Sequence, residues 1–316
     1  MKMHVSIIMV AAAAIFMLPA CQKLSGPEET PIPGIPMSLD LSIGANGTKA
    51  TYTADGNALK AVWDANEEVS VITYREYKPR TIDNFTYSGE AGKASVTFTG
   101  TFTGQSEVDA GAQVFVIYPA LSQGSGETKR SQSYGSSNIG YFESTITTEG
   151  SSSYVALKEM NNFKMNSNGD TEYIKYLDFM DGTAIIDGSS FTATLEKKMA
   201  IFKIIVTCDS ESFLGSLQME EDAYCIPITA NYTFYTRKWR DHNAYNTQNI
   251  VFDGCWNNKT DGKFVYYLPV IPGMTIANGT QITFRATGVA AHSTTKTINA
   301  DFTPVAGNVY TINVTF

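Results

Sequence analysis

The stretch from Arg237 to Tyr245 holds the residue types best suited to binding a small polar ligand. It reads Arg-Lys-Trp-Arg-Asp-His-Asn-Ala-Tyr. The indole ring of Trp239 could stack on a sugar ring while planar donors such as Arg237 and Arg240 bond its hydroxyl groups. His242 and Tyr245 would add polar contacts to the same site. The alternative is that Trp239 closes the end of a hydrophobic core while the charged neighbours face water.

Catalytic and metal-binding motifs are absent from the sequence. His242 and His292 are fifty residues apart, and neither belongs to an H-E-x-x-H motif. No G-x-S-x-G elbow, phosphate-binding loop or dinucleotide fingerprint occurs. Asp178 and Asp181 could pair as acid and base, but carboxylates at strand ends are usually solvated. We therefore expect no enzyme, no cofactor and no metal.

The thiol of Cys21 is the candidate for a covalent modification. An apolar run from Val5 to Leu18 follows a positive Lys2, and it is too short to span a bilayer as a helix. The sequence Leu-Pro-Ala-Cys that ends at Cys21 matches a bacterial lipobox, which predicts a signal peptide over residues 1–20 and acylation of Cys21. Several acyl chains on one cysteine hold a protein on a membrane. The alternative is an ordinary secretory signal followed by a chance cysteine.

Charge and cysteine content exclude several classes of protein. The formal net charge is −8, and no stripe of lysine and arginine is present, which argues against nucleic acid as a partner. The remaining cysteines, Cys208, Cys225 and Cys255, lack C-x-x-C spacing, so neither a zinc site nor a disulfide framework is indicated. Two of these cysteines could form one disulfide bond, or they could be buried free thiols.

The elements that must position these residues are short strands. Residues 21–36 are rich in proline and predict a flexible tether. Met37, Leu39, Leu41 and Ile43 then alternate with polar residues, which predicts a half-buried first strand. Similar runs recur to the end of the chain without a long helical period, so we expect an all-β fold in which sheets bury one face against each other.

Breaks in this pattern suggest two domains. Asp187-Gly188-Ser189 is the best candidate boundary, which gives an N-terminal β-sandwich over 37–188 and a C-terminal β-sandwich over 189–316. The apolar run 199–206 predicts a central strand of the second core, and Trp63 is assigned to the first. We expect residues 122–153 to form a polar loop and residues 209–260 to be irregular.

Six short segments follow the lipobox in a characteristic order, and the lipobox makes a seventh: residues 48–50, 63–71, 116–119, 198–202, 267–269 and 306–312. Together they resemble the fimbrillins, the lipoprotein pilins of Bacteroidales-type (type V) pili. The resemblance implies two antiparallel β-sandwich domains in tandem, Greek-key-like and transthyretin-like. It also implies export to the surface of the outer membrane and, after processing, a place in the fimbrium.

The resemblance further implies assembly by strand exchange with other pilin subunits, after a protease removes the first strand of Met37, Leu39, Leu41 and Ile43. Cleavage in the family follows a basic residue that Lys49 matches, although Lys49 could equally be a solvated strand-end residue. The chain stops at Phe316 within the last strand pattern, so we expect a tip or accessory subunit that adheres to a host protein or glycan. The alternative is a surface glycan-binding lipoprotein that does not polymerise.

Overall fold

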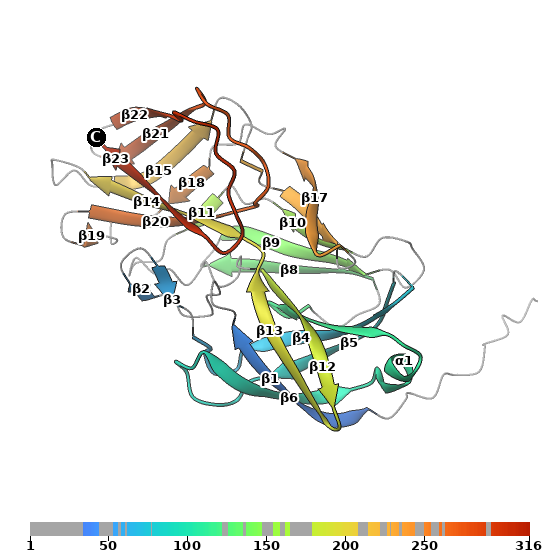
Figure 1. Ribbon diagram of the computed structural model, residues 1–316. Helices are drawn as coiled ribbons and strands as arrows, with labels where there is room; N and C mark the ends of the chain where they lie inside the picture. Colours follow the sequence, from blue (N-terminus) through green and yellow to red (C-terminus); the bar gives the residue numbers. More distant parts are fainter. Residues whose placement is uncertain are drawn as a thin grey trace, which may run out of the picture. The chain divides into compact units, whose positions relative to one another are not determined.

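The computed structural model describes eighteen segments of the chain: 34–43, 53–55, 58–60, 62–76, 78–121, 126–134, 137–146, 154–158, 162–164, 179–207, 214–221, 226–227, 229–233, 236–243, 250–253, 259–260, 263–288 and 292–316. The fold is all-β, as the sequence predicts (Figure 1). Within the described segments the single helix is α1 (Gln105–Asp109), of five residues. No described helix has the length and apolar character needed to cross a membrane.

Seven strands close into a barrel. In the order in which they pair, they are β1 (Ile35–Ile43), β13 (Ser190–Lys197), β12 (Met180–Asp187), β7 (Gln113–Tyr118), β4 (Glu68–Arg75), β5 (Lys78–Thr86) and β6 (Ser95–Phe102). β1 runs parallel to β13 on one side and antiparallel to β6 on the other. β1 therefore completes the barrel between two strands that are far from it in the sequence (Figure 1).

The seam between β5 and β6 is the shortest in the barrel. The two strands share only the register pairs Phe85↔Gly100 and Thr86↔Thr99. A Cβ atom on Gly100 would lie 2.7 Å from the Phe85 ring and 2.9 Å from the carbonyl oxygen of Asn84. Only glycine lets the two backbones approach so closely at this position.

Alternating apolar side chains fill the barrel. Met37, Leu39 and Leu41 are at most 5% exposed, which confirms the period-two pattern of the first strand, and Ile43 is half-buried against the same cluster. Trp63 is fully buried and meets the rings of Phe98 and Tyr118 edge-on, so its assignment to this core is confirmed.

Three further sheets and one short hairpin complete the described strands. One sheet contains β17 (Lys238–Asn243), β16 (Thr229–Thr233), β10 (Tyr154–Lys158), β9 (Ser137–Ile146) and β8 (Gly126–Tyr134). Another contains β11 (Asn162–Lys164), β18 (Ile250–Asp253), β15 (Leu214–Glu221), β21 (Gln281–Gly288) and β22 (His292–Thr297). The third contains β19 (Lys259–Thr260), β20 (Lys263–Val270), β14 (Ala200–Thr207) and β23 (Val309–Thr315), and the hairpin is β2 (Thr53–Asp55) with β3 (Ala58–Lys60).

β14 lies at the centre of the second core, as the sequence predicts. It pairs with β20 on one side and, in parallel, with β23 on the other. Phe202, Ile204 and Val206 are at most 2% exposed. Side chains of the β15 and β21 sheet join the same cluster, so these two sheets bury facing sides as in a sandwich.

The expected pair of tandem antiparallel sandwiches needs correction in three respects. The first sheet closes into a barrel, because β1 also pairs with β6. Three described strand pairs are parallel instead of antiparallel: β1 with β13, β11 with β18, and β14 with β23. The turn at 187–189, expected between domains, connects the paired strands β12 and β13 of this one barrel.

Strands also form where irregular structure was expected. β8, β9 and β10 occupy much of residues 122–158, and β15 to β18 lie within 209–260. β10 pairs with β16, and β11 pairs with β18, so strands from both halves of the chain share sheets. Segments this far apart in sequence are brought together by tertiary packing, which local periodicity does not reveal.

Candidate functional site

β1 is bound along both edges and on both faces. Its backbone pairs with β13 from Ser38↔Ser190 to Ile43↔Leu195, and with β6 from Ile35↔Phe102 to Ser42↔Ser95. On the outer face, Thr97 Oγ1 donates to Asp40 Oδ1 at 2.6 Å, and the hydroxyls of Ser42 and Thr194 lie 3.0 Å apart. β1 begins at Ile35, so the last two residues of the expected tether over 21–36 belong to this strand, and residues 21–33 lie outside the described segments.

β1 lies in an apolar groove between β6 and β13. β6 contributes Val96, Phe98 and Phe102 to the barrel core, and β13 contributes Phe191, Ala193 and Leu195. Without β1, these side chains and one edge of each strand would face solvent. Such a groove can accept another extended chain with apolar residues at every second position.

Cys21, the predicted lipidation site, and Lys49, the predicted cleavage site, lie outside the described segments. In the sequence, Lys49 falls between the end of β1 at Ile43 and the start of β2 at Thr53. A cut at Lys49 would therefore separate β1 from the rest of the barrel without dividing any other barrel strand.

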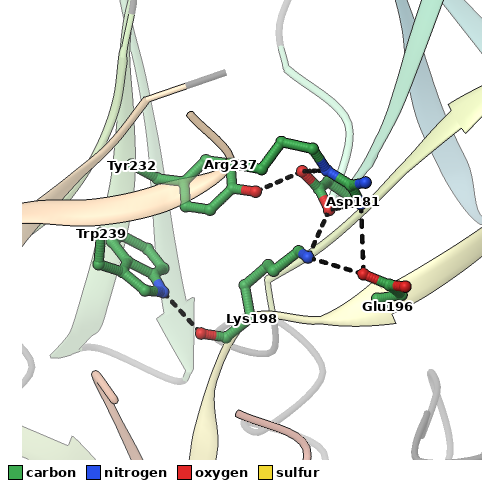
Figure 2. A network of polar contacts seen from close by, with 6 residues as sticks. All are labelled: Asp181, Glu196, Lys198, Tyr232, Arg237 and Trp239. Atoms are coloured by element: carbon green, nitrogen blue, oxygen red, sulfur yellow. Dashed lines mark hydrogen bonds and ion pairs between the residues drawn. The ribbon is translucent and has the colours of Figure 1, made fainter. Parts of the chain in front are cut away.

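A buried carboxylate lies at the centre of a second cluster. Asp181 on β12 is 1% exposed. It accepts hydrogen bonds from the Tyr232 hydroxyl and from Arg237, whose Nη2 lies 2.7 Å from Oδ1 and whose Nε lies 3.1 Å from Oδ2 (Figure 2). Lys198 Nζ lies 3.0 Å from Asp181 Oδ1. One carboxylate thus binds three donors from two parts of the chain, the β16–β17 hairpin and Lys198 after β13.

Lys198 and Trp239 extend this network. Lys198 Nζ also lies 3.0 Å from Glu196 Oε2, and the Lys198 carbonyl accepts the indole N–H of Trp239 at 2.6 Å. Trp239 is half-buried and meets the rings of Phe179 and Tyr232 edge-on. We call Asp181, Glu196, Lys198, Tyr232, Arg237 and Trp239 the Asp181 network. Its two carboxylates and two cations balance in charge.

Two groups of the Asp181 network, Tyr232 and Arg237, have shifted pKa values. Burial, together with the negative charge of Asp181, raises the pKa of Tyr232 far above its usual range, so the hydroxyl stays protonated and donates. The hydrogen bond to Asp181 raises the pKa of Arg237 further above its usual range. A permanently charged guanidinium with two bonds to one carboxylate holds that carboxylate rigidly.

The predicted ligand-binding residues take different positions. Arg237 and Trp239 belong to the Asp181 network, and Arg240 on β17 is exposed. His242 lies on β17, its side chain is not described, and Tyr245 lies outside the described segments. Trp239 packs against the second core, whereas Arg237 is paired with Asp181 instead of facing water. Ligand binding at this hairpin stays a prediction.

The sequence pattern did not indicate that Asp181 is the centre of a buried polar network. Its partner Asp178 in the expected acid–base pair lies outside the described segments, and Asp181 instead binds Tyr232 and Arg237, which are 51 and 56 residues away. No described group of three or more acidic, histidine or cysteine side chains could hold a metal ion.

Comparison with known proteins identifies the fold. No protein-family description and no curated protein sequence matches the chain. A candidate cell adhesion protein from Bacteroides uniformis is similar in structure, with a TM-score of 0.50, 13% identity and coverage of 89% of this chain and 92% of that one. A candidate cell adhesion protein from Bacteroides ovatus has a TM-score of 0.53, 11% identity and coverage of 90% and 92%.

A fimbrial protein from Bacteroides vulgatus is also similar, with 10% identity and coverage of 89% and 95%, but its TM-score of 0.44 is too low to support an argument. At these identities, the two stronger matches show a shared fold. The resemblance that the sequence predicts is thus supported at the level of the fold, which this chain shares with the two candidate cell adhesion proteins of Bacteroides.

Proposed function

We propose that this protein is a fimbrillin-like subunit of a surface fimbrium that assembles by exchanging its first strand. The observation that carries the proposal is the position of β1, which closes the barrel between β6 and β13 and buries Met37, Leu39 and Leu41. The shared fold with the two candidate cell adhesion proteins supports a role in adhesion. In this role the chain is a structural protein rather than an enzyme.

Loss of β1 should destabilise the barrel unless another strand takes its place. Full burial of Met37, Leu39 and Leu41 stabilises the barrel by about 1.5–3 kcal/mol for each side chain, before the entropy of ordering is subtracted. The unpaired edges of β6 and β13 would add exposed N–H and C=O groups. A strand from another subunit restores both the ladder and the packing, which is β-augmentation.

Processing and anchoring complete the proposal. Cleavage after Lys49 releases β1, because Lys49 lies between β1 and β2 in the chain. The acylated Cys21 holds the precursor on the outer membrane before that cut. The subunit then joins other pilin subunits in the fimbrium, where a host protein or glycan is the adhesive partner. The tip or accessory position stays a sequence-based prediction.

Digestion of the folded mature chain with a trypsin-like protease tests this proposal. We expect a fragment that ends at Lys49, measured by mass spectrometry, followed by ladders of subunits on a denaturing gel. Lys49→Gln should abolish both, while Lys93→Gln, at a residue whose side chain is 57% exposed, should change neither. A protein cut at Lys49 that stays monomeric would instead favour the non-polymerising glycan-binding lipoprotein.

A further inference from the structure

We infer that the groove left by β1 has one fixed wall, β13, which the Asp181 network holds in place, and one wall that closes later, β6. This inference rests on the proposed exchange of β1. It concerns the order of events at the groove, and it identifies Asp181 as a positioning residue for strand capture.

β6 depends on β1 for most of its pairing. The two strands share eight register pairs, whereas β6 shares only two with its other neighbour, β5. When β1 leaves, β6 therefore keeps the short seam around Phe85 and Gly100 and loses the rest of its ladder. A strand held by so few backbone hydrogen bonds opens readily.

β13 keeps its other neighbour when β1 leaves. Six register pairs join it to β12, from Asp187↔Ser190 to Met180↔Lys197. Just beyond its carboxyl end, the Lys198 N–H donates to the Phe179 carbonyl at 2.9 Å. The backbone of β13 is therefore paired at residues 190–193 and 196–197 from the side opposite to the groove.

The Asp181 network adds a second support to the β12–β13 pair. Asp181 on β12 lies opposite Glu196 on β13, and both are bonded to Arg237 and Lys198 (Figure 2). In another sheet, β16 carries Tyr232, β17 carries Trp239, and the turn between these strands carries Arg237. The network thus ties one wall of the groove to a sheet that does not include β1.

The network lies beside the groove without forming part of its apolar surface. The last register pair of β1 with β13 is Ile43↔Leu195, one residue before Glu196. Removal of β1 leaves the bonds of Asp181 to Tyr232, Arg237 and Lys198 in place. An incoming strand then finds β13 already positioned for parallel pairing, and β6 pairs with it afterwards.

Hydrogen exchange in the full mature chain tests this order. A site-specific protease sequence replaces residues 46–51, the folded protein is cut there, and a synthetic peptide with the sequence of residues 34–44 is added. As the cut fragment dissociates, we expect amides of β6 to exchange at least about tenfold faster than those of β13. Added peptide should restore protection on both strands.

Two substitutions test the role of the Asp181 network. Asp181→Asn should reduce the difference in exchange between β13 and β6 and slow peptide capture several-fold. Tyr232→Phe, which removes a single donor, should act in the same direction to a smaller extent, and it serves as the test if Asp181→Asn does not fold. Glu220→Gln, which breaks the exposed pair with Arg285, is the matched control and should change neither quantity.

The outcomes separate this inference from the proposed function. If the cut chain captures the peptide while the amides of β13 exchange as fast as those of β6, the inference that β13 stays in place is wrong, and the proposal of strand exchange stands. The same holds if Asp181→Asn and Tyr232→Phe both capture the peptide at the rate of the Glu220→Gln control. A cut chain that captures no peptide overturns both.

Discussion

Asp83 and Asp181 are two buried carboxylates that are stabilised by different kinds of donor. Asp83 is 5% exposed and accepts the backbone N–H of Thr103 at 2.9 Å and its hydroxyl at 2.8 Å. These donors are neutral, and burial raises the pKa of Asp83 above its usual range in spite of them. Asp181 instead faces Arg237 and Lys198, so its negative charge is paired.

Asp83→Asn should alter how stability depends on pH. Because the raised pKa means that the folded protein holds this proton more tightly than the unfolded chain, the group's contribution to stability is complete below the unfolded pKa of 3.8 and is lost as pH rises through the folded pKa. An amide does not titrate, so the variant should gain stability relative to the wild type as pH rises. Urea unfolding from pH 3.5 to 7 measures this, and parallel curves would show that Asp83 is not involved.

Asp181→Ala should destabilise the fold strongly. Removing the carboxylate leaves the partly buried Arg237 and Lys198 with only the exposed Glu196 as a counter-ion, and breaking a buried pair costs about 3–5 kcal/mol. Glu220→Ala removes a half-buried carboxylate from the exposed Arg285 and should cost less than about 1 kcal/mol. The free energy of unfolding in urea measures both, and equal losses would show that the Asp181 network contributes no more than a surface pair.

Individual core residues could be predicted from the sequence, whereas the partners of Asp181 could not. Period-two alternation identified Met37, Leu39 and Leu41 as buried, because one face of a strand must meet the core. No such rule connects Asp181 to Tyr232 or Arg237. Their contact depends on how two sheets pack, and only the tertiary structure supplies that.

The strongly apolar strand β14 was predicted correctly from the sequence, whereas the polar strand β8 was missed. β14 reads Ala-Ile-Phe-Lys-Ile-Ile-Val-Thr, and its central place in the second core follows from that composition. β8 reads Gly-Glu-Thr-Lys-Arg-Ser-Gln-Ser-Tyr, which has no apolar face to indicate a strand. The glycine turn at Gly188 was interpreted as a boundary because a hairpin turn and a linker have similar compositions.

The two faces of β14 should respond differently to truncation. Ile204 is fully buried, so Ile204→Ala should cost about 2–4 kcal/mol, because a cavity remains in a well-packed core. Ile205 is half-buried, so Ile205→Ala is the matched control on the same strand and should cost clearly less. Thermal and urea unfolding of both variants measure this. Similar losses below about 1 kcal/mol at both positions would contradict a central strand.

The arrangement of the whole molecule depends on pairs of strands that are distant in the sequence. β1 pairs with β13 across about 150 residues, and β10 pairs with β16. A barrel and a sandwich bury the same alternating side chains, so the sequence alone could not show that β1 also pairs with β6 and closes the first sheet. The shared fold with the two Bacteroides proteins agrees with the all-β expectation.

Cys21→Ala should prevent anchoring of the protein to the membrane. Without the thiol no acyl chain can be attached, so the variant should leave the membrane fraction or stay unprocessed. Fractionation of cells and partitioning into detergent measure this, with Cys208→Ala as the control. Unchanged partitioning of Cys21→Ala would show that the membrane attachment does not use this residue.

The replaceable first strand is the central claim, and the melting temperature of a chain that begins at Ala50 tests it most directly. Without β1, the groove lined by Phe98 and Phe191 is open to solvent, so this chain should melt well below the mature protein or aggregate. A peptide with the sequence of residues 34–44 should restore the melting temperature, and a peptide with Leu39 and Leu41 changed to Asp should not. A chain from Ala50 that is monomeric and melts at the temperature of the mature protein would contradict the account.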